Sequence, residues 1–95
     1  MIDLNFEKYT EMTLTDFQLK DSYDVQQWTH CIVRFMCDNM PEDIEDPEAL
    51  VILNQENDVL QISLYEEGCD SPNYQFTDGE KKQITNWLLA TIREG

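Results

Sequence analysis

The side chains of this chain that could support chemistry are mostly carboxylates, concentrated in one short segment. Residues 41–48 read PEDIEDPE and contain five acids and no base, namely Glu42, Asp43, Glu45, Asp46 and Glu48. Clustered carboxylate oxygens are the ligands that Ca²⁺ prefers. The segment lacks, however, the central glycine and the D-x-[DN]-x-[DN]-G order of a calcium-binding loop. We therefore expect no metal site and no cofactor.

Catalysis would have to involve the single histidine, His30, its neighbour Cys31, or a pair of carboxylates. The sequence predicts a helix here, on which consecutive side chains point about 100° apart. His30 and Cys31 would then not face each other as a base and a nucleophile do. Many carboxylate pairs exist among 20 acids, and no spacing singles one out. The sequence therefore predicts a protein without enzymatic activity.

The three cysteines include no CxxC pair and no His/Cys ligand spacing, which predicts neither a disulfide framework nor a zinc site. Free thiols are typical of a reducing compartment. The N-terminal residues lack the basic segment and apolar run of a signal peptide. The longest apolar run, residues 49–53, is too short to span a bilayer. We expect a cytoplasmic protein that does not associate with membranes.

Charge is distributed unevenly along the chain, which carries a net charge of −14. From Phe35 to Gly79 there are twelve acids and no lysine or arginine. For a globule about 32 Å across, the net charge amounts to roughly one negative charge per 2.3 Å. This is comparable to about one per 1.7 Å along a DNA duplex. A solvated face that keeps the protein soluble also explains such a run of charge.

The predicted binding surface combines these acids with two tyrosines. Tyrosines beside an acidic rim can anchor a partner, because they bury a large area at low rotamer cost. The predicted partner-binding residues are Glu42, Asp43, Glu45, Asp46, Glu48, Glu56, Asp58, Glu66, Glu67, Asp70, Tyr65 and Tyr74. Direct binding of nucleic acid is excluded by the lack of clustered bases.

The elements that would position these residues follow from hydrophobic spacing. Apolar residues alternate from Ile2 to Phe6, which predicts a strand with one buried face. Residues 12–19 predict a second strand, with a bulge at Asp16 where the pattern changes phase. From Ser22 to Asn39 apolar residues recur every three or four positions and predict a helix capped by Ser22. Its apolar positions are Val25, Trp28, Ile32, Phe35 and Met36.

The second half of the chain predicts a hairpin and a helix. Residues 50–54 and 58–66 form the two arms, and the first is apolar on both faces, as in a central strand. Residues 68–77 predict a loop with a brief extended piece at 74–76. Thr77 and Glu80 have the spacing of a capping box. The helix that follows carries Ile84, Trp87, Leu88, Thr91 and Ile92 on one stripe.

The predicted order ββαββα indicates a single α+β domain spanning residues 1–95. In this fold, two helices cover one face of a four-stranded, mainly antiparallel sheet. Trp28 and Trp87 occupy the apolar stripes and are expected in the core.

The leading functional hypothesis is a non-enzymatic inhibitor whose acidic surface blocks the basic, nucleic-acid-binding site of a partner protein. The chain shares only charge and size with DNA-mimic proteins, such as phage antagonists of restriction or CRISPR defence, and with acidic immunity proteins. The alternative hypothesis is an immunity or adaptor protein that neutralises a cationic toxin or effector through a mostly apolar, tyrosine-centred contact. Under either hypothesis, the net charge of the chain predicts a monomer or a weak homodimer.

Overall fold

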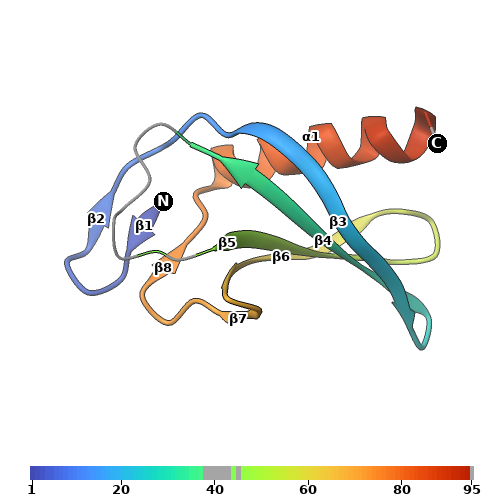
Figure 1. The fold of residues 1–95 in the computed structure, drawn as a ribbon, viewed down its shortest axis with the longest axis horizontal. Coiled ribbons are helices and arrows are strands. Elements are labelled where there is room, and N and C mark those ends of the chain that lie inside the picture. Colours follow the sequence, from blue (N-terminus) through green and yellow to red (C-terminus); the bar gives the residue numbers. More distant parts are fainter. Residues whose placement is uncertain (38–43, 45, 95) are drawn as a thin grey trace.

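The apolar run for which the sequence predicts a central strand lies in the middle of a five-stranded antiparallel sheet (Figure 1). The computed structural model describes residues 1–37, 44 and 46–94. In spatial order the strands of this sheet are β3 (Thr15–Val25), β4 (Trp28–Met36), β5 (Pro47–Leu53), β6 (Val59–Glu66) and β7 (Cys69–Asp70). Ala49, Val51 and Leu53 of β5 join the main hydrophobic cluster, whereas Glu48 and Leu50 are buried on the opposite face. The predicted central strand and the hairpin to β6 are confirmed.

A second, three-stranded sheet lies at one end of the molecule (Figure 1). It has the order β2-β1-β8 and consists of β1 (Ile2–Asp3), β2 (Lys8–Tyr9) and β8 (Tyr74–Gln75). The prediction that the first strand continues to Phe6 is wrong, and the Phe6 side chain is 81% exposed. The backbone N–H groups of Asn5 and Phe6 donate to Oδ1 of Asp3, at 3.0 and 3.2 Å. The carboxylate thereby stabilises a turn that ends β1.

The predicted fold class, a four-stranded sheet with two helices, is wrong. The described chain has two sheets and one helix, α1 (Asp78–Glu94). The segment Ser22–Asn39, predicted as a helix, forms the end of β3, a turn and β4 as far as Met36. Along β4, the side chains of Cys31, Val33 and Phe35 alternate into the core, a period of two that the helical spacing concealed.

The turn between β3 and β4 also lacks the usual sequence signal. Its central residues are Gln26 and Gln27, and Gln26 has a φ of 58°. Two-residue hairpin turns with positive φ favour glycine, asparagine or aspartate. A pair of glutamines therefore gives no indication of a hairpin. The aromatic and β-branched residues of β4 stabilise the strand by packing against β5.

Register shifts decide which side chains of the sheet face solvent. The register of β3 shifts against β4 around Asp16, which has a φ of 52°, so the predicted bulge is confirmed. On β6, Leu60 is an extra residue between the partners of Ile52 and Leu53. Val59 consequently packs against the core, and Leu60 is 52% exposed.

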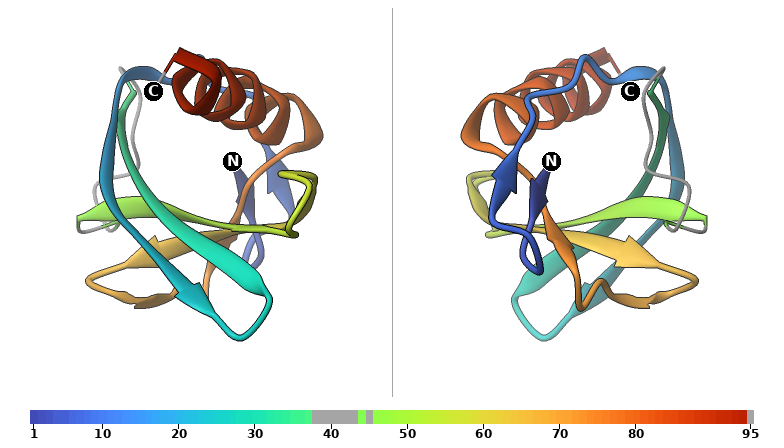
Figure 2. Two further views of the ribbon diagram at one scale, coloured as in Figure 1. Left: turned by 90° about the vertical axis from the view of Figure 1, so that its right-hand side faces the viewer. Right: turned by 90° about the vertical axis from the view of Figure 1, so that its left-hand side faces the viewer.

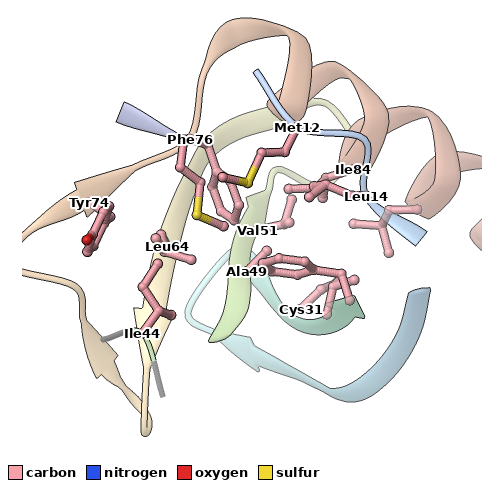
Figure 3. Packing of buried hydrophobic residues seen from close by; sticks show 14 of the residues in the cluster. Met12, Leu14, Cys31, Ile44, Ala49, Val51, Leu64, Tyr74, Phe76 and Ile84 are labelled. Carbon is pink, nitrogen blue, oxygen red and sulfur yellow. The ribbon is translucent and has the colours of Figure 1, made fainter. Parts of the chain in front are cut away.

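The predicted C-terminal helix is confirmed, and it covers the inner face of the curved five-stranded sheet (Figure 2). Ile84 and Leu88 of α1 are fully buried. Figure 3 shows Ile84 in one cluster with Leu14, which precedes β3, and with Val51 of β5. The helix therefore packs on the sheet through the apolar stripe that the sequence predicts.

One buried carboxylate holds the start of the helix. Thr77 and Glu80 form the predicted capping box: the Glu80 N–H donates to Oγ1 of Thr77 at 3.1 Å, and the Thr77 N–H donates to Oε1 of Glu80 at 2.9 Å. The other carboxylate oxygen accepts from the Met12 N–H at 2.8 Å and from the N-terminal ammonium of Met1. Glu80 is fully buried. It therefore joins the helix to two separate points of the first twelve residues.

Further contacts fix the segment before β3 against α1. The side-chain amide of Gln83 accepts from the Leu14 N–H at 2.8 Å and donates to the Met12 carbonyl at 2.9 Å. A Cβ at Gly79 would lie 1.5 Å from Oε1 of Glu11, so a larger residue here would displace the exposed carboxylate of Glu11. Residues 11–14 are therefore placed by the helix rather than by a neighbouring strand.

Candidate interaction surface

The two layers of the fold differ strongly in charge. From β3 to β8 the described residues include ten acids and only two bases, a net charge of −8. Helix α1 carries three acids and three bases and is therefore neutral. The strands and their turns thus hold most of the described negative charge.

The predicted acids fall into two groups at opposite ends of the β5–β6 hairpin. Glu56 and Asp58 lie in the exposed turn between the strands. Asp46, Glu67 and Asp70 are exposed near the other end, together with the half-buried Glu66. Seven residues of β5 separate the groups by about 20 Å. The predicted site residues Glu42, Asp43 and Glu45 lie outside the described residues.

Glu48 does not contribute an exposed charge, contrary to its predicted role. Its side chain is buried, and its Oε2 accepts from Nζ of Lys20 at 2.9 Å and from Nε of Arg34 at 3.4 Å. These are the two bases of the strand region, and both are partly exposed. Glu48 offsets only one of these two positive charges, so the cluster keeps a net charge of +1 beside the other nine acids of the strand region.

These three side chains line a groove of about 770 Å³ at one end of the five-stranded sheet. Asp16 of β3, Asp46 before β5 and Glu67 in the β6–β7 turn also line it. The groove therefore contains the ion-paired carboxylate of Glu48 and three further acids from separate segments of the chain.

The two predicted tyrosine anchors differ in exposure. Tyr74 is 8% exposed and belongs to the core cluster, so its ring is not available to a partner. Tyr65 is half-buried on β6, opposite Glu48 on one side and Asp70 on the other. Burial, followed by the charge of Asp70, raises the pKa of the Tyr65 phenol. Its hydroxyl therefore stays protonated at neutral pH and can donate a hydrogen bond.

Exposed aromatic and apolar side chains occur at the β3–β4 hairpin, where the sequence predicts a helix. Trp28 is 40% exposed, which corrects its predicted place in the core, and its strand neighbours Tyr23 and Val25 are similarly exposed. The rings of Tyr23 and His30 are 5.4 Å apart. An alternating pattern over residues 28–36 was the signal available in the sequence. Trp87, by contrast, packs against the core and stacks on Phe17 at 5.3 Å.

No protein-family model, curated protein or solved structure matches this chain. Within the described residues, no group of three or more His, Cys, Asp or Glu side chains is arranged to hold a metal ion. The single helix of the described chain is too short and too polar to cross a membrane.

The three thiols should differ in reactivity, because their exposure differs. Cys69 is exposed, Cys37 is half-buried and Cys31 is buried, and burial raises the pKa of the Cys31 thiol above its ordinary value of 9.0. Since the thiolate is the reactive form, we expect Cys69 to react fastest with Ellman's reagent at pH 7.5, and Cys31 only on unfolding. A Cys69→Ser variant should lose the fast phase. A fast phase retained in that variant would contradict the assignment.

The same shift has a consequence for stability at high pH. The pKa of Cys31 is raised in the folded state, so folding favours its neutral thiol. This stabilisation is fully present below the ordinary pKa and is lost as the pH rises through the raised value.

Proposed function

We propose that this protein is a non-enzymatic inhibitor that binds a basic, nucleic-acid-binding site on a partner protein through its strand layer. The observation that carries the proposal is the contrast between a strand region of net charge −8 and a neutral helix. A surface of this kind presents carboxylates where the partner normally meets phosphates.

The two bases of the strand layer, Lys20 and Arg34, do not cancel its excess of acid. Both bases lie on the strand layer, but each is bound to the same carboxylate oxygen. With both bases and Glu48 counted, the strand region still has a net charge of −8 and therefore a negative field. Such a field steers a basic partner toward the strand layer and disfavours acidic partners.

The proposal places the protein in the cytoplasm as a monomer or a weak homodimer. All three cysteines are free thiols, as is usual in a reducing compartment. A net charge of −14 opposes the association of two copies.

The proposal can be tested with heparin-binding proteins from a bacterial lysate, which are enriched in basic nucleic-acid-binding proteins. The inhibitor is immobilised, a captured protein is identified, and its binding to duplex DNA is measured with the inhibitor added at 50 and 200 mM salt. We expect inhibition of DNA binding, and we expect it to weaken steeply with salt because both surfaces are charged.

A pair of matched variants locates the contact. The triple variant Asp16→Asn, Asp21→Asn, Asp70→Asn removes three exposed charges from the strand layer. The control Glu7→Gln, Glu11→Gln, Asp78→Asn removes three exposed charges elsewhere. We expect at least a tenfold loss of inhibition for the first and little change for the second. Equal losses, or a captured protein without a basic nucleic-acid site, would refute the proposal.

The alternative, an immunity or adaptor protein with a mostly apolar contact, is favoured by one observation. Tyr23 and Val25 are exposed side by side with Trp28 on the β3–β4 hairpin. An apolar contact of this kind would persist at 0.5 M salt and would be lost on Tyr23→Ala. The burial of Tyr74 argues against a contact centred on that residue.

A further inference from the structure

The β3–β4 and β5–β6 turns lie at the end of the molecule opposite the three-stranded sheet (Figure 1). Residues of both turns line a hollow of about 270 Å³. The β3–β4 side contributes Gln27 and Trp28, and the β5–β6 side contributes Asn54, Gln55 and Glu56. The two turns meet here because β4 and β5 are paired neighbours, with Thr29 opposite Leu53. The hollow therefore combines an exposed indole with a carboxylate.

The polar side chains that line the hollow differ in whether they bond within the protein. Asn54 builds the turn, because its Oδ1 accepts from the backbone N–H groups of Glu56 and Asp58, each at 2.9 Å. The carboxylate of Glu56 makes no ion pair within the described residues. Glu56 also lines a second hollow, which includes Arg93. Glu56 is thus an exposed charge beside Trp28.

We propose that this hollow binds an arginine side chain of the basic partner, with the guanidinium stacked on Trp28 and paired with Glu56. This inference rests on the proposed function and names the contact by which the acidic surface would recognise its partner. An aromatic face attracts a cation through its quadrupole, and tryptophan is the best side chain for this. Gln27 and Gln55 also line the hollow, and a glutamine side-chain amide can accept a hydrogen bond.

Arginine fits the hollow better than lysine does. Its planar guanidinium stacks on aromatic rings and donates several hydrogen bonds in fixed directions, whereas the lysine ammonium is a compact and strongly hydrated charge. The hollow offers a flat indole next to a carboxylate, the combination that a planar, bidentate donor can use.

The test uses the full chain labelled with ¹⁵N and titrated with hexaarginine and hexalysine peptides of equal charge. The indole N–H of Trp28 reports on the hollow, and that of Trp87, which stacks on Phe17 at the core, serves as an internal control. We expect the Trp28 signal to shift with hexaarginine and the Trp87 signal to stay in place. Hexaarginine should bind more tightly than hexalysine by about two- to fivefold.

Substitutions separate the hollow from the general acidic surface. Trp28→Ala should remove the preference for hexaarginine. Glu56→Gln should reduce this preference while leaving the Trp28 indole in place. Matched controls are Tyr9→Ala, an exposed aromatic residue on β2, and Glu7→Gln, an exposed acid in another turn. We expect both controls to keep the preference of the unmodified protein.

The outcomes distinguish this inference from the function on which it rests. Equal affinity for the two peptides, with neither the Trp28→Ala nor the Glu56→Gln variant changing it, would overturn the arginine site and leave the acidic surface intact. Failure of both peptides to bind at 50 mM salt would overturn the acidic-surface proposal as well.

Discussion

Replacing Glu80 with glutamine should lower the free energy of unfolding by about 3–5 kcal/mol. This is a large fraction of the roughly 5–15 kcal/mol that stabilises a small domain. The substitution removes the negative partner of the buried Met1 ammonium and weakens the acceptors of the Met12 and Thr77 N–H groups. A buried charge without its partner is costly, because it has lost its hydration and gained no counter-charge. Urea denaturation followed by circular dichroism measures the effect.

The matched control is Glu7→Gln, which removes one exposed carboxylate from a surface turn. Its effect should stay within about 0.5 kcal/mol. If Glu80→Gln were equally mild, the convergence of donors on this carboxylate would contribute little to stability, and α1 would be held by its apolar face alone.

The second large effect is expected for Leu88→Ala, which should destabilise the protein by about 2–5 kcal/mol. Leu88 has 0% exposure and lies on the stripe by which α1 packs on the five-stranded sheet. Truncation removes buried methyl and methylene groups and leaves a cavity that the helix and sheet cannot fully close. The midpoint of urea denaturation should shift while the slope of the transition stays the same.

Leu60→Ala provides the comparison, because the register shift on β6 leaves this leucine half-exposed. We expect it to cost less than about 1 kcal/mol. A cost equal to that of Leu88→Ala would mean that Leu60 is covered in solution, for example by a second copy of the chain. Sedimentation at low and high protein concentration would then reveal the association.

The parts of the fold that the sequence predicts correctly have strong local signals. Thr77 and Glu80 specify the start of α1 through hydrogen bonds only three residues apart, and the helical stripe behind them is regular. Residues 50–53 of β5 are apolar on both faces, as is typical of a central strand. The bulge at Asp16 is visible as a change of phase in the alternation.

The errors arise where tertiary contacts override a local pattern. The spacing of apolar residues from Val25 to Met36 fits a helix, but β5 offers β4 a neighbour that buries Cys31, Val33 and Phe35. The spacing of these residues fits both a helix and a strand, and pairing with β5 in the complete sheet favours the strand. The sequence predicts a loop from residue 68 onward, but the structure has a tight β6–β7 hairpin there. Glu67 and Gly68 form its turn, and both have positive φ.

The binding surface was only partly predictable for the same reason. Composition alone reveals the excess of acid, but the pairing of Glu48 with two bases depends on the alignment of three strands. Tyr74 follows a proline-containing polar loop, which gives no sign that β8 carries its ring into the core. Trp28 is exposed because its segment is a strand, whereas the predicted helix would place its ring in the core.

The hydrogen bonds that join residues 11–14 to the start of α1 also have a consequence for biosynthesis. The Met12–Glu80 and Leu14–Gln83 hydrogen bonds join residues 68 and 69 positions apart. At about 5–20 residues per second, a ribosome needs roughly 3–14 s to add that length of chain. During this interval the nascent strands lack the helix that shields their apolar face. Completion of this part of the native structure must therefore await the emergence of α1 from the exit tunnel.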